Sequence, residues 1–400
     1  MSHSTTTAPH RIVVLGAGYA GMAAAVRVAR RTRRLGAEVV LVNPTSRFAE
    51  RLRMHQTAAG QQPADLRIPE LVAGSGVEFV QGWATAIDAE RQELTLTAPE
   101  GVRTLAYDTL VHALGSATDT DVVPGIEEHA FTLDGQDAAE RLAARLAELD
   151  AAGGGTVTVS GSGLTGVEAA AEIAESHPAL RVVLLGRERP GSMMGPKARA
   201  YLDAALVRLG VEVRSGVEVT KVLPDGIELA DGELVHSDAS LWTAGVRVSR
   251  LAAEAGIATD EHGRVLTEPS LRSTSHPAVW AVGDAAAVRQ SYGVLHGTCQ
   301  SGIPTGMHVA DQIARVLRGG APKPFRFGHI HQPVSLGRHD GVIQFTRGDD
   351  TPRAFCLTGA RAVAYKEFVS GSPAKTYRMS VRFDVPTRMM WARGGRRNGR

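Results

Sequence analysis

Apolar and polar positions follow the same order in two blocks of the chain. Residues 11–31 begin with a short apolar run, pass through a turn rich in glycine and continue as an alanine-rich segment. Residues 156–175 repeat this order 145 residues further along the chain. A short apolar run that ends in glycine is typical of a buried parallel strand, and an alanine-rich segment of this length favours a helix. The two blocks therefore predict an α/β fold with two parallel-sheet units.

Both turns carry three glycines in the spacing G-x-G-x-x-G. They are Gly16, Gly18 and Gly21 in the first block, and Gly161, Gly163 and Gly166 in the second. The first glycine permits a tight turn, the second lets the backbone approach a pyrophosphate, and the third lets helix and strand pack closely. The helix N-terminus also presents free N–H groups to phosphates. We therefore expect two Rossmann-like dinucleotide sites, with Tyr19, Ala20 and Leu164 among their residues.

The end of the second strand in each unit is the expected position of a ribose ligand. In the first unit it is Asn43, whose amide can bond ribose hydroxyls; a turn residue before proline is the alternative. In the second unit the stretch VVLLGRERP places Gly186, Arg187, Glu188 and Arg189 there. A carboxylate would repel a 2′-phosphate, whereas arginine donors suit it. Because of these two arginines, the sequence favours NADPH over NADH. The alternative is that both arginines are solvated and Glu188 binds the ribose.

A third segment points to the other nucleotide. TSHPAVWAVGDAA, residues 274–286, is an apolar strand that ends in Gly283 and Asp284. It resembles the T-x6-A-x-G-D motif of the two-dinucleotide-binding-domain flavoproteins, in which the aspartate accepts a hydrogen bond from a ribityl hydroxyl of FAD. YDTLVHALGS and ASLWTAGV, with Gly115 and Gly245 at their ends, resemble the segments that leave each nucleotide domain of this family.

The resemblance extends from about residue 11 to about residue 370, and the nearest branch is that of the type II NADH dehydrogenases and related FAD-dependent oxidoreductases. LWTAGV, PGIEEHAFTL and GRHDGVIQF are similar to segments of that branch. The resemblance implies an FAD-binding domain (1–120 and 251–320) interrupted by an NAD(P)H-binding domain (121–250). A C-terminal α+β domain (321–400), with FGHIHQPVSLG and GVIQF as strands and a basic tail, would cover the flavin.

The cysteine content narrows the chemistry. Cys299 and Cys356 are the only cysteines and lie 57 residues apart, whereas disulfide reductases of this fold carry C-x4-C or C-x2-C beside the flavin. We therefore expect hydride transfer from NAD(P)H to non-covalently bound FAD, and from there to a quinone-like or other small aromatic acceptor. The cofactors perform this chemistry, the protein supplies alignment and electrostatics, and no metal is needed.

Several side chains are candidates for the reacting centre. Glu168 follows the third glycine of the second unit; in the family this glutamate approaches the flavin–nicotinamide junction, and the alternative is a carboxylate that complements the helix dipole. The stretch ERLRMHQ follows the first unit's second strand, where the chain passes near the isoalloxazine, so Arg51 and His55 are candidates for the cofactor and acceptor pocket. Lys366 could reach the flavin from the C-terminal domain, with a solvated lysine as the alternative.

The acceptor side departs from the family pattern. Quinone reductases of this branch carry a segment A-Q-x-A-x-Q-Q, whereas this chain has TCQSGIPTG at residues 298–306. Gln300 matches the first glutamine, but the residues after it differ, which puts a membrane quinone in doubt and favours a soluble acceptor. A helix that begins near Pro304 would direct its positive end at the flavin.

Composition adds limits on location. Residues 371–400 contain one lysine and seven arginines against a single aspartate, so this tail is near +7 and the remaining chain near −5, for a net charge of +2. We interpret the tail as a solvated, frayed terminus, and contact with anionic lipid or a partner is the alternative. No apolar run of about 18 residues and no N-terminal apolar region are present, so a cytoplasmic protein is expected.

Two other functional classes share these motifs. One is an NAD(P)H-responsive redox sensor similar to the apoptosis-inducing factors, and the other is a reductase for ferredoxin or rubredoxin. A sensor would form a long-lived reduced complex, whereas an enzyme would turn over with added quinone. The expected partner is a small-molecule electron acceptor and not nucleic acid, and the chain is expected to be a monomer or a homodimer.

Overall fold

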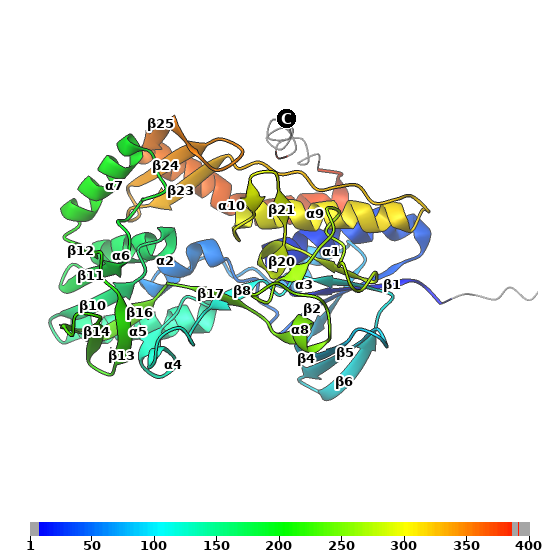
Figure 1. Ribbon diagram of the computed structural model, residues 1–400, viewed down its shortest axis with the longest axis horizontal. Helices are drawn as coiled ribbons and strands as arrows, with labels where there is room; N and C mark the ends of the chain where they lie inside the picture. The colour runs from blue at the N-terminus through cyan, green and yellow to red at the C-terminus, as the bar shows by residue number, and fades with distance from the viewer. Residues whose placement is uncertain (1–7, 386–390, 392–400) are drawn as a thin grey trace, which may run out of the picture.

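The structure is a computed structural model that describes residues 8–385 and Trp391 (Figure 1). Two five-stranded parallel sheets organise it, as the two repeated blocks predict. The first sheet lies to the right in Figure 1, and its strand order is β19-β7-β1-β2-β3. Its strands are β19 (Val279–Ala281), β7 (Thr109–His112), β1 (Arg11–Leu15), β2 (Glu38–Asn43) and β3 (Val77–Gln81). The sheet thus joins segments that are about 170 residues apart in sequence, between β7 and β19.

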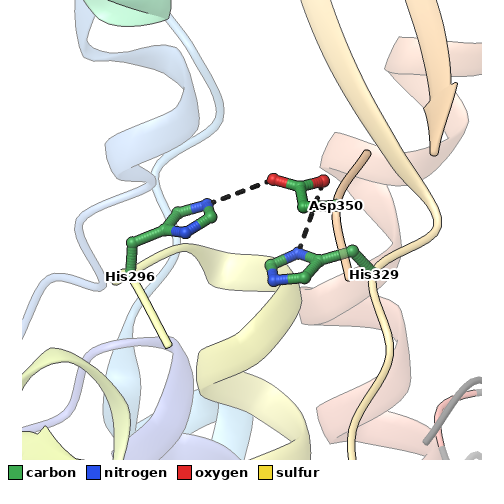
Figure 2. A group of neighbouring side chains, drawn as sticks. All are labelled: His296, His329 and Asp350. Atoms are coloured by element: carbon green, nitrogen blue, oxygen red, sulfur yellow. Dashed lines mark ion pairs between the residues drawn. The ribbon is translucent and has the colours of Figure 1, made fainter. Parts of the chain in front are cut away.

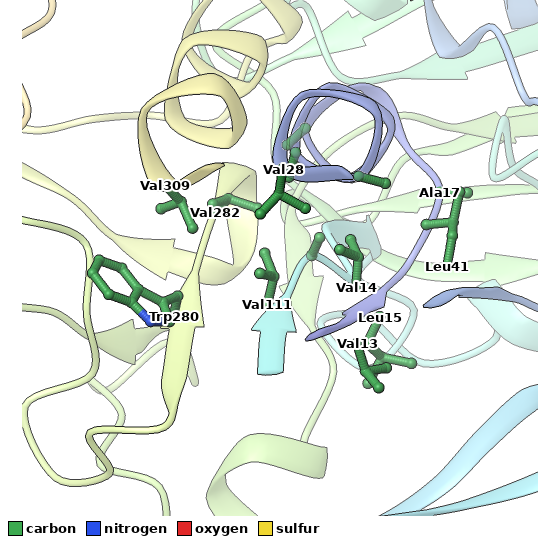
Figure 3. Packing of buried hydrophobic residues seen from close by; sticks show 14 of the residues in the cluster. Val13, Val14, Leu15, Ala17, Val28, Leu41, Val111, Trp280, Val282 and Val309 are labelled. Carbon is green, nitrogen blue, oxygen red and sulfur yellow. The ribbon is translucent and has the colours of Figure 1, made fainter. Parts of the chain in front are cut away.

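Two long helices pack together on this sheet. Helices α1 (Tyr19–Thr32) and α9 (Cys299–Val316) lie side by side, α1 above β1 and β7 and α9 above the end of β19, and Figure 3 shows the buried side chains beneath them. Val14, Val28, Val111 and Val309 are all fully buried there. Small residues on both helices permit this approach, because a side chain at Gly306 would meet the backbone oxygen of Ala20 at 2.1 Å.

The second sheet, to the left in Figure 1, has the order β12-β11-β10-β16-β9 and is also parallel throughout. Its strands are β12 (Glu212–Ser215), β11 (Leu180–Gly186), β10 (Gly155–Ser160), β16 (Ala239–Trp242) and β9 (Ala130–Phe131). Helices α5 (Gln136–Ala151), α6 (Leu164–Ser176) and α7 (Pro196–Arg208) accompany it. The predicted strands and helices of both nucleotide units are therefore confirmed.

Short antiparallel elements connect and flank the two units. The ribbon β8 (Ser116–Thr118) with β17 (Val246–Val248) runs between them, and its strands follow the two predicted exit segments. Two meanders, β4-β5-β6 and β13-β14-β15, flank the first and second sheet respectively. Their strands are Trp83–Asp88, Glu93–Ala98 and Gly101–Ala106, then Val219–Leu223, Gly226–Leu229 and Leu234–His236. The domain boundaries at 120, 250 and 320 stay a prediction.

The C-terminal part is an antiparallel sheet followed by a long helix. Strands β23 (His331–Ser335), β24 (Gly341–Thr346) and β25 (Pro352–Thr358) form the sheet, which confirms the two strands expected there. Helix α10 (Ala360–Arg382) packs against this sheet and against α1, so it joins the C-terminal sheet to the first nucleotide unit. No helix in the described part of the chain is long and apolar enough to cross a membrane.

Two expectations about the C-terminal third are wrong. Residues 371–382 are not a frayed terminus: they complete α10, where Tyr377 is 1% exposed and its hydroxyl donates to the Tyr19 oxygen over 3.0 Å. The rest of the predicted tail, residues 386–390 and 392–400, lies outside the described residues. Helix α9 begins at Cys299 and not near Pro304, because the N-cap residue Thr298 and Ser301 in the first turn form a capping box.

Candidate functional site

The two glycine turns have the same geometry. Gly16 and Gly161 have φ of +105° and +119°, which a residue with a side chain rarely adopts. A side chain at Gly21 would meet the Gly16 oxygen at 1.8 Å, and Gly166 has the same relation to Gly161. In contrast, a side chain at Gly18 would meet nothing within 4 Å. The outer glycines therefore serve packing, while the middle one leaves the backbone of α1 open to a phosphate.

Gly163 repeats the feature of Gly18 at the second turn. A side chain there would also meet nothing within 4 Å, and neither helix has a side chain that caps its first amides. Backbone N–H groups of α1 and α6, next to Ala20 and Leu164, are thus available at both helix N-termini. The donor set fits the pyrophosphate of a dinucleotide at each turn.

Asn43 supports the first turn from the end of β2. Its Oδ1 accepts a hydrogen bond from Ala17 N at 3.0 Å, and its Nδ2 donates to the Thr45 oxygen at 2.9 Å. The amide is therefore committed to backbone groups on both sides. These bonds agree with the turn-residue alternative, whereas a bond from Asn43 to ribose hydroxyls stays a prediction.

Asp284 lies at the carboxyl end of β19, close to the first glycine turn. A side chain at Gly283 would meet the Ala20 Cβ at 3.1 Å, so the motif of residues 274–286 adjoins α1. The Asp284 carboxylate accepts a hydrogen bond from Ser116 Oγ at 2.7 Å and is approached closely by the Gly297 backbone. The carboxylate is half-buried, and its bond to a ribityl hydroxyl of FAD stays a prediction.

The exit segments complete this region. Gly115 and Gly245 have φ of +67° and +76° and turn the chain into β8 and β17. Arg51 donates to the Ser116 oxygen and, over 3.2 Å, to Asp134. Arg51 therefore anchors the stretch after β2 to the segment that leaves the FAD unit.

Three of the four predicted catalytic side chains meet in one buried cluster. Glu168 on α6, His55 on α2 (Met54–Ala58) and Lys366 on α10 come from three parts of the chain. Lys366 Nζ donates to Glu168 Oε1, which also accepts from Ser335 N at 3.0 Å. His55 Nδ1 lies 3.9 Å from Glu168 Oε2. We call this set, Glu168, His55, Lys366 and Ser335, the junction cluster.

Burial and charge set the protonation of the junction cluster. Lys366 and His55 lower the pKa of Glu168, although its burial opposes this, so the carboxyl is ionised. Burial lowers the pKa of His55 to about 4, with the nearby Lys366 charge acting in the same direction and Glu168 opposing it. The cluster at neutral pH is therefore a buried carboxylate–ammonium pair beside a neutral imidazole.

Glu172, one turn along α6 from Glu168, extends this cluster and was missed in the sequence analysis. Its side chain is fully buried, Oε1 accepts from Gln61 Nε2, and Arg338 Nε lies 3.8 Å away. Oε2 has no hydrogen-bond partner and faces His55 Nε2, also without one, at 4.0 Å. Burial raises the pKa of Glu172 to about 7. The i, i+4 spacing of two glutamates after the glycine turn was the available signal.

Gln300, the fourth candidate, holds the C-terminal sheet in place. Its Nε2 donates to the His331 oxygen at 2.8 Å, and its Oε1 accepts from Ile330 N at 2.7 Å. Both ends of the amide are thus bonded to the backbone at the start of β23. The structure does not bring Gln300 into the junction cluster, and its contacts indicate a positioning residue at the start of α9.

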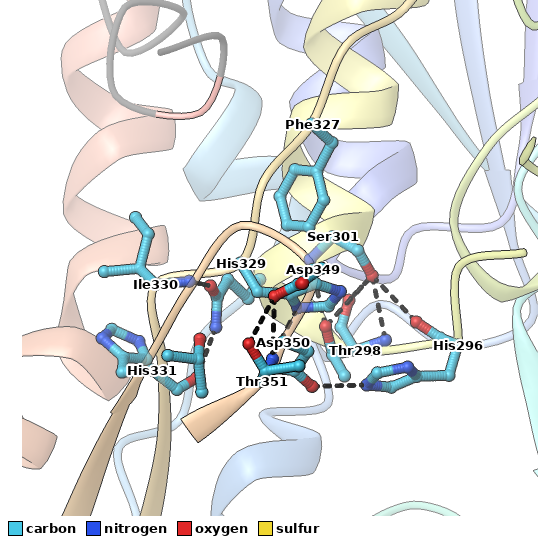
Figure 4. Close-up of polar contacts among 12 residues, drawn as sticks. His296, Thr298, Ser301, Phe327, His329, Ile330, His331, Asp349, Asp350 and Thr351 are labelled. Carbon is cyan, nitrogen blue, oxygen red and sulfur yellow. Dashed lines mark hydrogen bonds and ion pairs between the residues drawn. The ribbon is translucent and has the colours of Figure 1, made fainter. Parts of the chain in front are cut away.

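A second polar cluster lies near the start of α9. His296 and His329 stack with ring centroids 5.0 Å apart, and Asp350 reaches both rings, at 3.4 Å and 3.8 Å (Figure 2). Figure 4 shows that it adjoins the Thr298–Ser301 capping box. The three ligand atoms lie within 4.8 Å of one another, close enough for one metal ion. The same atoms already pair with each other, so the cluster links the loop before α9 to the turn that precedes β25.

The stretch at the end of β11 has a packing reason for its glycine. A side chain at Gly186 would meet Ser162 Oγ at 2.2 Å, and that hydroxyl donates to the Glu188 oxygen at 2.8 Å. Arg187 is exposed and pairs with Glu218, and Arg189 is exposed and pairs with Asp203 at 3.2 Å. Both arginines are accessible beside the second glycine turn, but each already has a carboxylate partner.

Comparisons with known proteins agree with this geometry. Residues 10–313 match the family model of the pyridine nucleotide-disulphide oxidoreductases. An NADH dehydrogenase-like protein of Mycobacterium tuberculosis is 36% identical, covering 93% of this chain and 92% of that protein. A type II NADH:quinone oxidoreductase of Staphylococcus aureus is 27% identical, covering 83% and 89%. The solved structure of NDH2 from Plasmodium falciparum in complex with NADH superposes with a TM-score of 0.76, at 13% identity, covering 94% and 98%.

Proposed function

Because the chain belongs to the pyridine nucleotide-disulphide oxidoreductase family, we propose that it oxidises NADPH through FAD and reduces a quinone-like or other small aromatic acceptor. The enzyme class rests on the family and on relatives of the type II NADH:quinone oxidoreductase kind. The preference for NADPH and the choice of acceptor belong to this proposal. The junction cluster is the observation that carries it.

The residues around the first glycine turn fit FAD. The open backbone at Gly18 would hold its pyrophosphate, and the Asp284 carboxylate would accept a ribityl hydroxyl. Gly163 offers the same open backbone to the pyrophosphate of NADPH. When bound, the flavin supplies the two-electron redox chemistry between NADPH and the acceptor. The chain would supply the alignment of the two nucleotides.

The junction cluster supports a direct role of Glu168 and Lys366 where the two nucleotides would meet. Glu168 is the fifth residue of α6, just beyond the NADPH turn, and Lys366 reaches it from the C-terminal part that is expected to cover the flavin. A buried ion pair holds its geometry because either charge alone would be costly to bury. Glu168 would orient the nicotinamide and the acceptor, while Lys366 would offer a positive charge to an acceptor oxygen.

The two free cysteines favour a small aromatic molecule, and not a disulfide, as the electron acceptor. Cys299 and Cys356 are both unpaired, and burial raises the pKa of the Cys299 thiol to about 11. A thiol held in its protonated form is a poor nucleophile. Two-electron transfer to an aromatic acceptor needs neither cysteine. A monomeric or homodimeric cytoplasmic enzyme stays the expectation.

An anaerobic screen tests the proposal. Purified protein with one non-covalent FAD should be reduced rapidly by NADPH and reoxidised by soluble quinones in repeated turnovers. Glu168→Gln should keep its flavin but slow at least one half-reaction in stopped-flow measurements. A reduced flavin–nicotinamide complex that persists when quinone is added would instead indicate a redox sensor. Turnover confined to an added iron–sulfur protein would indicate a ferredoxin-type reductase.

A further inference from the structure

Six arginines line one hollow beside the first nucleotide unit. The hollow measures about 460 Å³, and the arginines are Arg30, Arg31, Arg33, Arg34, Arg318 and Arg382. We call it the arginine pocket. A smaller hollow of about 390 Å³ shares Arg31 and Arg318 with it and adds Arg315 and Lys323. The two hollows form one basic region.

Three helix C-termini bring these arginines together. Four of them belong to the end of α1 and the short turn after it, one follows α9, and Arg382 ends α10. The pocket is thus at the opposite end of α1 from the glycine turn. Since α1 has 14 residues, the two sites are about 20 Å apart. The pocket is therefore separate from the FAD pyrophosphate site.

The carboxylates near the pocket balance only part of its charge. Asp311 pairs with Arg27 at 2.9 Å and with Arg31 at 3.0 Å, and Asp384 pairs with the same two arginines at 3.3 Å and 3.0 Å. The negative charges of Asp311 and Asp384 are therefore balanced by Arg27 and Arg31. Within the described part of the chain, the other five pocket arginines have no carboxylate at ion-pair distance. They are Arg30, Arg33, Arg34, Arg318 and Arg382.

Helix dipoles do not account for this concentration of charge. The negative end of a helix favours a cation by at most about 1 kcal/mol at an exposed site. Five unbalanced guanidinium groups around one hollow repel one another, in a chain whose net charge is only +2. An anion in the hollow would remove that repulsion. Guanidinium groups bind phosphate in particular, because their paired N–H donors match two phosphate oxygens.

We propose that the arginine pocket binds a phosphate-bearing anion, either a free di- or polyphosphate or the phosphate of a lipid headgroup. Val26 and Val381 give the hollow a partly apolar wall. Leu35 and Phe383, which follow Arg34 and Arg382 in sequence, are 40% and 63% exposed. This combination accommodates a phosphate on the arginines with apolar groups beside it. The proposal does not depend on the redox function.

Binding experiments on the FAD-loaded enzyme test it. Calorimetry at low ionic strength measures pyrophosphate affinity, with sodium chloride at matched ionic strength as the blank. The pocket variant is Arg33→Gln with Arg34→Gln, since both side chains are exposed on the turn after α1. The matched control is Arg91→Gln with Arg141→Gln, which removes two exposed arginines elsewhere. Flavin content and NADPH turnover should be unchanged in both.

Pyrophosphate affinity should fall about tenfold or more in the pocket variant and less than twofold in the control. Sedimentation with vesicles of phosphatidylglycerol, and of phosphatidylcholine as the neutral reference, separates the two sources of phosphate. The site binds a lipid headgroup if wild type and control sediment with phosphatidylglycerol vesicles, the pocket variant does not, and no pyrophosphate binding is measurable. If neither probe binds, or if both variants bind as the wild type does, the proposal is wrong.

Discussion

Replacing Glu172 by glutamine should stabilise the protein at alkaline pH. The side chain is fully buried, and burial raises the pKa of its carboxyl from 4.5 to about 7. Glutamine has the same shape, and its oxygen can still accept from Gln61 Nε2. Its amide nitrogen would face His55 Nε2, which otherwise has no partner. The substitution therefore removes a buried charge and leaves the packing intact.

The size of the effect follows from the pKa. One pKa unit corresponds to about 1.4 kcal/mol, so a change from 4.5 to about 7 corresponds to about 3 kcal/mol. Because folding raises the pKa of Glu172, this side chain makes its full contribution to stability below pH 4.5 and loses it as the pH rises to about 7. Arg338 and Lys366 moderate this loss and Glu175 adds to it. Glu172→Gln should show no such loss.

The measurement is thermal unfolding of the FAD-loaded protein from pH 5 to pH 8. The difference in Tm between Glu172→Gln and wild type should be near zero at pH 5 and grow to a few degrees by pH 8. Glu261→Gln removes an exposed carboxylate and serves as the control. A difference that stays constant with pH, or a wild type that is more stable at pH 8, would refute the reasoning.

Three further predictions test other contacts. Lys366→Ala should cost about 3 kcal/mol in the free energy of unfolding, because it leaves the Glu168 carboxylate buried without its cation; denaturant unfolding measures it, with Lys375→Ala on the same helix as the control. Gly21→Ala should abolish FAD retention, since the added methyl would lie 1.8 Å from the Gly16 oxygen; flavin absorbance reports this, and Gly371→Ala should keep its FAD. Arg187→Ala should lower kcat/KM for NADPH tenfold or more while NADH changes little; an equal loss for both nucleotides would contradict the assigned preference.

Local patterns determined the nucleotide units of this protein. The apolar runs, the spacing of Gly16, Gly18 and Gly21, and the strand before Asp284 each lie within about 20 residues. Such patterns specify a strand, a turn and a helix directly, because backbone conformation depends on near neighbours. The error at the start of α9 was also local: the weight given to Pro304 obscured the capping signal of Thr298 and Ser301.

Tertiary structure decided which of the candidate side chains act together. Glu168 and Lys366 are 198 residues apart, and nothing in a lone lysine distinguishes a buried partner from a solvated side chain. Gln300 was an equally good candidate for the reacting centre from the sequence, but it bonds to the backbone at the start of β23. The arginine pocket likewise exists only where the ends of α1, α9 and α10 meet. Burial and charge pairing arise from contacts between distant segments, and these become defined when the helices pack on the two sheets.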